Sequence, residues 1–474
     1  MTRIDTEVLV VGSGAGGATT AVTLAEGGRD VVVLEEGPWV QPGTTEPFSL
    51  GEMALQYRHH GSSAALGSPP VAYAEGRCVG GSTEVNSGLW HRIPGDLAER
   101  WRHHYDIDGF DSDTLDRYAA LVEGWQSVSS LPGDPPPSSA ALATGADGLG
   151  WRAMEFPRVY RYPEGAPAEK QTMTRTLLPR AVDAGARIEP ESRVHRLTRR
   201  RGRVTGAVVR RRRPDGTHED VTVRADQVVV CGGAVHSPAL LQRSGIWRGI
   251  GGGLKMHPTI KLVARFPDAV DHDDVPPHRI TEFSPDIAIG GSASRRGHIA
   301  LALADGGSDA GTSAWEDMFV YYAAIRSDSG GRVVAIPGAS APLVSYRLTD
   351  GDLSRLARGL VHLGQALLEA GATELHPSVR GGTVARTPAD LARWWDEIDR
   401  STANLMTVHL TSSIRMGEAP GRAGADSWGR VHGIDGLRVN DASLVPDAPG
   451  VNPQAAIMTI AARNADRLLD ELRS

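Results

Sequence analysis

The chain has 474 residues, a mass of 50.4 kDa and a formal net charge of −7 at pH 7. With 40% hydrophobic and 23% charged residues, it resembles a globular protein with a sizeable core, and nothing in this balance favours nucleic-acid or anionic-membrane partners. Glycine is enriched, at 56 of 474 residues or about 12% against an average of roughly 7%. We therefore expect several loops whose backbone conformation or close contacts require glycine.

Cysteine content and hydropathy exclude further classes of protein. Two cysteines, Cys78 and Cys231, make neither a disulfide framework nor a metal cluster, so we expect buried thiols and no metal site. No apolar run approaches the roughly 18–20 residues of a membrane span. A strand is expected within ten residues of Met1, which leaves no room for a signal peptide and favours a cytoplasmic protein. The arginine runs 199–203 and 210–213 are expected on a solvated hairpin.

The N-terminal segment has the pattern of a βαβ unit. Glu7 to Val11 is short and rich in β-branched residues, which predicts a buried strand. An alanine-rich helix should follow and end at about Glu26, where Gly27 and Gly28 give a C-cap signal. A second strand is predicted over 30–34.

Further along the chain, turn residues and hydrophobic periodicity separate the expected elements. Residues 51–75 suggest an irregular loop, and the segment 131–150, rich in Pro, Ser, Gly and Ala, suggests a surface excursion with one short helix. Alternating valines predict a β-meander over 193–230, and the apolar run 318–325 predicts a strand. Helical spacing predicts further helices over 113–125, 350–370, 388–398 and 453–472.

The first candidate site is the glycine loop between the first strand and helix. In the run Gly12-Ser13-Gly14-Ala15-Gly16-Gly17, the first glycine permits a tight turn, the second lets the backbone approach a pyrophosphate, and the last allows close contact between helix and strand. Glu35, at the end of the second strand, has the position of an acid that accepts hydrogen bonds from a ribose. The pattern predicts dinucleotide binding but does not separate FAD from NAD.

Three later segments also combine glycine with polar side chains. Residues 76–88 read Gly-Arg-Cys-Val-Gly-Gly-Ser-Thr-Glu-Val-Asn-Ser-Gly, a loop suited to a polar planar ligand or an ordinary turn. A second glycine pair, Gly232-Gly233, follows an apolar strand and begins a helix. The C-terminal part carries His409 at the head of His-Leu-Thr-Ser-Ser-Ile-Arg-Met-Gly, then the segments 436–443 and 450–454.

These four sites, in this order, resemble the glucose–methanol–choline (GMC) oxidoreductase family of FAD flavoproteins. The resemblance covers the N-terminal 95 residues, about 193–258 and 405–474, and it is loose over 259–400. Segments 331–350 and 370–372 look most like the long-chain alcohol oxidase branch of the family.

The resemblance implies an α/β fold with a Rossmann-like FAD-binding domain and a discontinuous, sheet-containing substrate-binding domain. The expected FAD-binding parts are 1–95, 172–258 and 409–474, the last with the catalytic residues. A substrate-side excursion over 96–171 and a substrate-binding domain over 259–408 lie between these parts.

The resemblance also implies roles for individual residues. His409 matches the active-site histidine of the family, and Asn452 matches its partner. The implied FAD-binding residues are Gly12, Ser13, Gly14, Ala15, Gly17, Glu35, Arg77, Gly80, Gly81, Ser82, Asn86, Ser87, Val194, Gly233, Asp441, Ala442, Asn452, Pro453 and Gln454. Because the Gly80–Gly88 loop has no histidine for a covalent flavin link, FAD is expected to bind non-covalently.

The implied reaction is oxidation of an alcohol to an aldehyde or ketone by hydride transfer to flavin. A neutral imidazole suits removal of the hydroxyl proton, so His409 is the candidate base, and Asn452 would hold the alcohol oxygen. A helix starting at Pro453 would direct its positive end at the flavin. We expect a hydrophobic or secondary-metabolite alcohol and oxygen or another electron acceptor.

Other interpretations stay open from the sequence. Asn452 is also a good N-cap for the helix after it, and His409 and His257 are also consistent with structural histidines. The aromatic residues of 315–322 belong either to a core strand or to a pocket wall. The same fold could perform lyase, decarboxylation or unusual oxygenation chemistry, or bind a flavin without catalysis.

Overall fold

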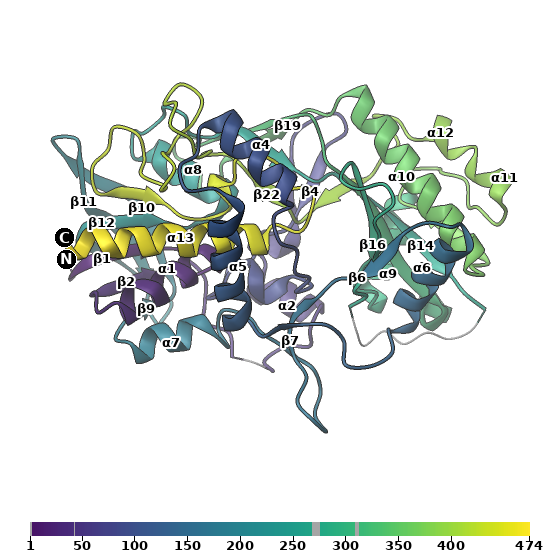
Figure 1. Cartoon of the computed structure of the whole chain (residues 1–474), viewed down its shortest axis with the longest axis horizontal. Helices are drawn as coiled ribbons and strands as arrows, with labels where there is room; N and C mark the ends of the chain where they lie inside the picture. Colours follow the sequence, from purple (N-terminus) through teal and green to yellow (C-terminus); the bar gives the residue numbers. More distant parts are fainter. Residues whose placement is uncertain (1, 42, 268–274, 309–311) are drawn as a thin grey trace.

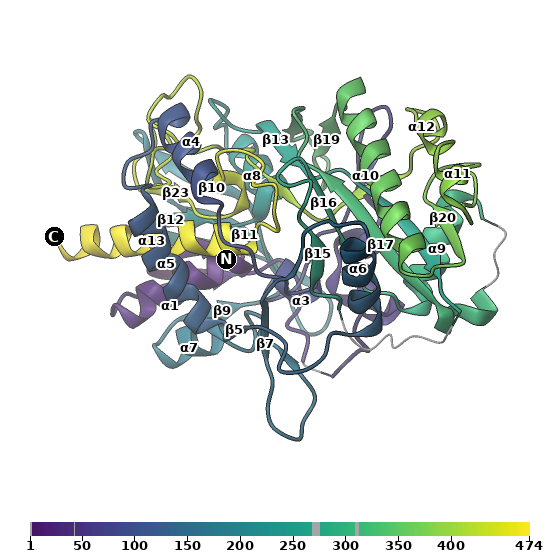
Figure 2. The same ribbon diagram turned by 45° about the vertical axis from the view of Figure 1, so that its right-hand side comes forward.

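The computed structural model describes residues 2–41, 43–267, 275–308 and 312–474. The chain forms an elongated molecule with two lobes, each built around a large sheet (Figure 1). Both termini lie at the outer end of the left-hand lobe, and the lobes stay distinct when the molecule is turned by 45° (Figure 2). The α/β class expected from the sequence is confirmed.

The left-hand lobe contains a seven-stranded sheet in the order β10-β11-β12-β1-β2-β9, with β23 beside β12. Strand β1 is parallel to both β2 and β12, whereas β10, β11 and β12 form the expected antiparallel meander. The strands are β1 (Thr2–Val11), β2 (Val31–Leu34), β9 (Arg187–Glu189), β10 (Ser192–Arg200), β11 (Arg203–Arg212), β12 (His218–Val230) and β23 (Leu437–Val439).

Both faces of this sheet are covered, which explains why β1 is apolar without alternation. Val8 and Val10 belong to the cluster on one face, and Leu9 and Val11 belong to the cluster on the other. The first face is covered by α1 (Ala15–Glu26), α7 (Leu177–Asp183) and α13 (Gln454–Arg473), and the second by α4 (Gly95–Tyr105) and α8 (Gly233–Arg243).

The right-hand lobe contains a nine-stranded sheet in the order β3-β4-β21-β14-β17-β16-β15-β6, with β20 beside β14. Helices α6 (Pro137–Gly148) and α10 (Asp350–Glu369) cover one face, and α9 (Arg296–Gly306) covers the other. The strands are β3 (Ser63–Ala65), β4 (Val71–Tyr73), β6 (Ala153–Glu155), β14 (Thr259–Arg265), β15 (His278–Ile280), β16 (Ile287–Gly291), β17 (Met318–Ile325), β20 (Glu374–Pro377) and β21 (Leu405–Thr407).

Two smaller sheets and several short helices complete the described residues. The sheet β19-β18-β13-β22 uses β13 (Gly252–Met256), β18 (Gly331–Val334), β19 (Leu343–Tyr346) and β22 (Leu410–Thr411). The sheet β5-β7-β8 uses β5 (Val128–Ser129), β7 (Arg158–Arg161) and β8 (Glu169–Lys170). The remaining helices are α2 (Leu50–Gln56), α3 (Ser82–Val85), α5 (Ser112–Trp125), α11 (Pro388–Leu391), α12 (Trp394–Glu397), η1 (Arg58–Gly61), η2 (Thr312–Asp317) and η3 (Ala442–Leu444).

The structure contradicts three sequence-based expectations. Residues 51–75 are not an irregular loop but form α2, η1, β3 and β4, because β4 pairs with the distant β21. The segment 131–150 is not a surface excursion, since α6 packs so closely on α10 that a Cβ on Gly145 would lie 1.8 Å from the Ala366 carbonyl oxygen. The helix expected over 388–398 is divided into α11 and α12. None of the helices in the described ranges has the length and apolar character needed to cross a membrane.

Candidate active site

The carboxyl ends of three strands of the left-hand sheet open into one cavity. Gly12 follows β1, Glu35 follows β2 and Gly232 follows β12, and all three residues line it. Because β1 is parallel to both neighbours, these ends lie at the same edge of the sheet, where open α/β sheets bind their ligands.

The cavity continues from this sheet edge to the C-terminal histidine segment. Most of the residues proposed from the sequence line its wall: Gly12, Ser13, Gly14, Ala15, Glu35, Gly81, Ser82, Asn86, Ser87, Val194, Gly233, His409, Asp441, Ala442, Asn452, Pro453 and Gln454. Gly17, Arg77 and Gly80 do not line it and lie behind its wall. Segments far apart in the sequence therefore meet around one elongated space.

In the first glycine loop, residues 12–17, backbone atoms pack directly against the backbone of neighbouring segments. Gly12 has a φ of +105°, and a Cβ on it would lie 2.3 Å from the Cys231 carbonyl oxygen. A Cβ on Gly17 would lie 1.9 Å from the Gly12 carbonyl oxygen, which agrees with the expected contact between helix and strand. Gly14 differs, because its Cβ would meet nothing closer than Gly81 Cα at 3.9 Å. The space beside Gly14 is thus open to a ligand.

Ser13 and Glu35 form a buried hydrogen-bonded pair beneath this loop. The Glu35 carboxylate accepts hydrogen bonds from the Ser13 amide at 3.1 Å, the Ser13 hydroxyl at 2.7 Å and the Gly37 amide at 3.0 Å. The Ser13 hydroxyl also accepts from the Gly80 amide at 3.1 Å. Burial raises the pKa of Glu35. Ser13 therefore joins the two glycine loops and explains why Gly80 lies behind the wall.

The second glycine loop is fixed to the start of α13. Asn86 Nδ2 donates to Gln454 Oε1 at 2.6 Å, and Asn86 Oδ1 accepts from the Gly88 amide at 3.0 Å. Lys170 donates to the backbone carbonyls of Glu84, at 3.0 Å, and Asn86. Burial lowers the pKa of Lys170 to about 8.

Asp441 connects the third and fourth segments. Its carboxylate accepts from the amides of Gly233 and Ser443, both at 2.8 Å, and from the hydroxyls of Ser237 and Ser443. Burial raises the pKa of Asp441. With these bonds Asp441 holds the Gly232-Gly233 turn against η3, where Ala442 lines the cavity.

A charged cluster near Glu35 was not expected from the sequence. Glu36 pairs with Arg58 at 3.2 Å and with Arg77 at 3.4 Å; Arg77 is thus directed at Glu36, while Glu36 and Arg58 line the cavity. Although burial opposes it, the charge of Arg58 lowers the pKa of Glu36 to about 2. From the sequence, the only indication of this cluster is that Glu36 directly follows Glu35. The pairing with Arg58 could not be read from the sequence, because Arg58 belongs to a different segment of the chain.

His409 lies where two sheets meet. It separates β21 from β22, and His257 separates β13 from β14. Because β21 pairs with β14 and β22 pairs with β13, the two histidines are brought to the same crossing. Their Nδ1 atoms are 3.0 Å apart, with the rings at 89°. His257, which the sequence left as a structural histidine, thus contacts the candidate base.

The hydrogen bonds of His257 fix the proton positions on both rings. The Gly450 amide donates to His257 Nε2 at 3.1 Å, so neutral His257 carries its proton on Nδ1. His257 then donates to His409 Nδ1, which places the His409 proton on Nε2. Burial lowers the pKa of His257 to about 4, and burial followed by the charges of His257 and Arg279 holds the pKa of His409 well below its ordinary value. Both rings are therefore neutral at pH 7.

Asn452 presents an unused acceptor at the same end of the cavity. Its Oδ1 atom is buried and has no hydrogen-bond partner among the described residues. Helix α13 begins at Gln454 after Pro453, and no side chain caps it. The alternative that Asn452 simply caps this helix is thus wrong for its side chain. His91, which the sequence did not single out, is also buried with both ring nitrogens unpartnered.

These features fit a dinucleotide with a planar ring system. Helix α1 starts at Ala15 with Gly14 before it and no side-chain cap, so its first amide groups are available to a pyrophosphate. The cavity wall continues through Asn86 and Ser87 to the start of α13, beside His409 and Asn452.

Comparison with known proteins agrees with this geometry. Residues 7–259 and 337–461 match the N-terminal and C-terminal family models described as GMC oxidoreductase. A relative named as an uncharacterised GMC-type oxidoreductase of Sinorhizobium fredii is 38% identical over 98% of this chain and 95% of its own length. The long-chain-alcohol oxidase FAO1 of Arabidopsis thaliana is 25% identical over 99% of this chain and 67% of its own.

The solved structures include a similar fold at low sequence identity. The crystal structure of pyridoxine 4-oxidase from Mesorbium loti has a TM-score of 0.73, with 20% identity over 98% of this chain and 99% of that chain. Because the family models together span most of the sequence and a relative shares more than a third of its residues, the chain belongs to the GMC oxidoreductase family of FAD flavoproteins.

Proposed function

We propose that this protein oxidises an alcohol to an aldehyde or ketone with FAD, and that His409 and Asn452 act on the alcohol. The observation that carries the proposal is the position of these two side chains on the wall of the same cavity as the glycine loops. Asn452 presents a buried acceptor without a partner, and His409 is held by His257. Membership of a family that includes alcohol oxidases supports the same chemistry.

FAD, when bound, supplies the ring that takes a hydride from the carbinol carbon. The protein has to orient the alcohol and remove its hydroxyl proton. Asn452 Oδ1 accepts a hydrogen bond from the hydroxyl group, and the start of α13 favours negative charge on the group bound beside it. The His409 edge opposite His257 faces the alcohol oxygen.

The tautomer of His409 determines whether this residue donates a hydrogen bond to the alcohol or accepts the hydroxyl proton as a base. With the proton on Nε2, His409 donates to the alcohol oxygen, whose own proton is bonded to Asn452 Oδ1. The general-base role requires the His409 proton on Nδ1 instead, and the hydroxyl proton then turns from Asn452 Oδ1 to the free Nε2 of His409. That exchange turns the His257 proton toward the Gly450 amide, so a hydrogen bond is lost at a cost of about 1–3 kcal/mol. His257 therefore sets the cost of forming the basic tautomer.

The experiment that tests the proposal is anaerobic reduction of the flavin. Alcohols mixed with the FAD-loaded protein should bleach the flavin absorption and yield the carbonyl product. If product forms without bleaching and without an electron acceptor, the protein performs lyase or decarboxylation chemistry instead. If no alcohol reacts, and His409→Ala changes no measured property, the protein only binds the flavin.

The proposal also includes the mode of FAD binding, the electron acceptor and the cellular compartment. FAD is bound non-covalently, so denaturation should release all of it into the supernatant. The electron acceptor is oxygen or another small molecule, which reoxidation of the bleached protein in air identifies. The protein acts in the cytoplasm.

The aromatic residues of 315–322 give less support to a hydrophobic substrate than the sequence suggested. Of the aromatic residues in 315–322, Phe319 and Tyr321 are 2% and 0% exposed and lie in the core cluster, and Trp315 packs against the cluster under α9. Tyr322 differs, because its ring contacts the guanidinium of Arg279.

A further inference from the structure

One buried arginine of the right-hand lobe has no counter-charge among the described residues. Arg279, on β15, is 6% exposed, and its Nε atom is fully buried with no partner. Within the described part of the chain, its guanidinium makes no hydrogen bond or ion pair. The equally buried Arg463 differs, because it donates to the carbonyls of Gly109, Ser427 and Asp108 and to Asn464.

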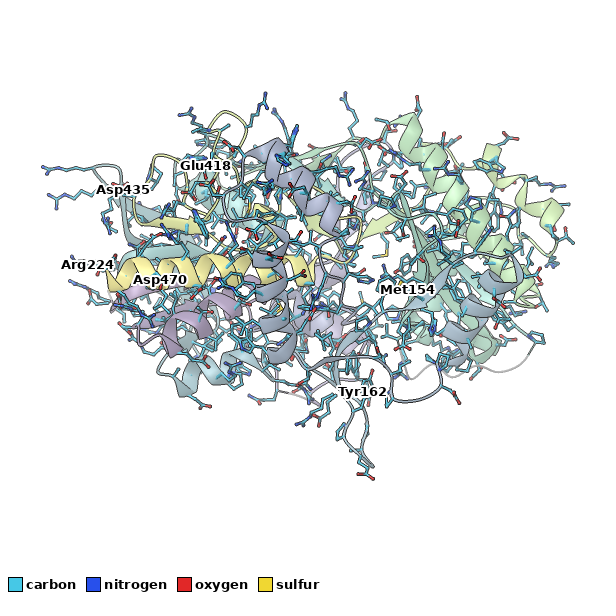
Figure 3. The ribbon with its side chains drawn as sticks, in the orientation of Figure 1. Met154, Tyr162, Arg224, Glu418, Asp435 and Asp470 are labelled. Atoms are coloured by element: carbon cyan, nitrogen blue, oxygen red, sulfur yellow. The ribbon has the colours of Figure 1, made fainter. Side chains whose placement is uncertain are left out.

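Aromatic rings hold the Arg279 side chain in place. Its guanidinium carbon lies 5.5 Å from the centre of the Tyr322 ring and 5.9 Å from that of Phe156. The Phe156 ring in turn lies 3.9 Å from the His91 ring. Gly290 on β16 leaves room for this arrangement, because a Cβ there would lie 2.9 Å from the Tyr322 hydroxyl. The right-hand lobe in Figure 3 contains this site, and Met154, labelled there, is the β6 residue opposite Arg279.

Two acids on neighbouring segments are used elsewhere. Glu282 pairs with Arg152 at 2.9 Å, and Glu155 accepts from the Leu131 amide at 2.8 Å. The positive charge of Arg279 instead acts on His91, His257 and His409, and after burial it helps to lower the pKa of each. Among the described residues the guanidinium is therefore uncompensated, and its charge acts on the proposed catalytic histidine.

A desolvated cation is costly unless an anion is bound beside it. We propose that Arg279 binds a carboxylate carried by the substrate, so that the alcohol is a hydroxy acid with a single carboxylate. This inference rests on the proposed function and names its substrate class. One unpaired guanidinium matches one negative charge, and its planar fork matches the two carboxylate oxygens. During the reaction the carboxylate would be unchanged: the carbinol carbon would give its hydride to bound FAD and the hydroxyl oxygen its proton to His409 Nε2, which leaves an oxo acid.

Binding of simple carboxylates to the FAD-loaded protein tests this inference without any substrate being turned over. Propionate and benzoate, which have no hydroxyl group to oxidise, are titrated into the FAD-loaded protein while the flavin spectrum is followed. Their amides, propionamide and benzamide, are the matched neutral probes. We expect the acids to perturb the spectrum, the amides to bind much more weakly, and Arg279→Gln to weaken acid binding by about 100-fold. Arg279→Lys should retain part of the binding, and Arg332→Gln, at an exposed position of β18, should retain all of it.

The outcomes separate this inference from the proposed function. If neutral alcohols bleach the flavin and neither acid binds, the hydroxy-acid inference is overturned and alcohol oxidation stands. If the acids bind through Arg279 but no hydroxy acid or alcohol bleaches the flavin, the anion site stands and the proposed function fails. If acid binding survives in Arg279→Gln while the flavin midpoint potential shifts, the guanidinium serves the cofactor and the inference is wrong. Because acids and amides are compared on the unaltered protein, the test holds even if a variant misfolds.

Discussion

Two groups of residues around the cavity differ in how their polar atoms are satisfied. At the glycine-loop end, Ser13 and Glu35 are fully buried or nearly so, and their side-chain oxygens bind backbone amides and each other. At the histidine end, His91 and Asn452 are left with buried polar atoms that no described residue satisfies. Since native proteins rarely leave such atoms unpaired, the side chains of the first group hold the glycine loops in place, and those of the second group are available to a ligand.

The two ends of the cavity also differ in how clearly they can be recognised in the sequence. The glycine-loop end is made from backbone that follows directly on strands, so its requirements appear as glycines in one short run. The histidine end is made from side chains that arrive from β13–β14, β15 and β21–β22. If this contrast is real, variants at the two ends of the cavity should differ in stability, FAD content and the rate of flavin reduction.

Gly17→Ala and Gly14→Ala should separate packing from cofactor binding within one loop. A Cβ on Gly17 overlaps the Gly12 carbonyl at 1.9 Å, so the free energy of unfolding should fall by about 3 kcal/mol or more. A Cβ on Gly14 has room in the protein alone, so Gly14→Ala should fold normally but lose FAD. Thermal unfolding and the FAD content of the purified variants measure both effects. Equal melting temperatures for the two variants would contradict this reading of the loop.

His409→Ala should slow flavin reduction by about 100- to 10,000-fold, the range typical for loss of a general acid or base. The FAD content should be unchanged, because the glycine-loop end is untouched. Stopped-flow absorption under anaerobic conditions measures the rate. His218→Ala, at the exposed start of β12, is the control and should behave as the unaltered protein. Reduction of His409→Ala at the normal rate would remove this residue from the chemistry.

Asn452→Ala and Ser13→Ala form a matched pair across the cavity. Loss of the Asn452 hydrogen bond should slow flavin reduction by about 10- to 100-fold without lowering stability, because its Oδ1 has no partner to lose. Ser13→Ala leaves the Gly80 amide without its acceptor and should cost about 1–3 kcal/mol of stability. Chemical denaturation compares the two. A larger stability loss in Asn452→Ala would reverse the contrast between the ends.

The pH dependence should show the smallest effect. A histidine whose pKa is lowered in the folded protein stays neutral as the pH falls below the ordinary imidazole value of about 6.5. Flavin reduction should therefore stay level through this range and be lost only at more acid pH, where His409 gains a proton. His257→Phe removes one cause of the lowered pKa, so the acid limb should move to higher pH. An unchanged limb in this variant would mean that His257 does not act on His409.

Much of the site could be predicted because its signals are local. The βαβ unit, the order of the glycine loops and the strand over 318–325 follow from periodicity and turn residues in single short segments, and the structure has all of them. Two of the failures have one physical cause. Strands β3 and β4 form only because β21 offers a partner, and α6 is buried only because α10 covers it, so no local pattern could reveal either.

The sequence by itself predicted a dinucleotide-binding fold and, through its resemblance to the GMC family, the candidate base and its asparagine partner. Backbone geometry at a glycine and the spacing of apolar residues are properties of neighbouring positions, which a sequence states directly. Only the tertiary structure decided which tautomer His409 adopts, through Gly450 and His257, and left Arg279 without a counter-charge among the described residues. Hydrogen bonds and electrostatic fields depend on distance in space, and the two histidines become neighbours only where the nine-stranded sheet meets the four-stranded sheet.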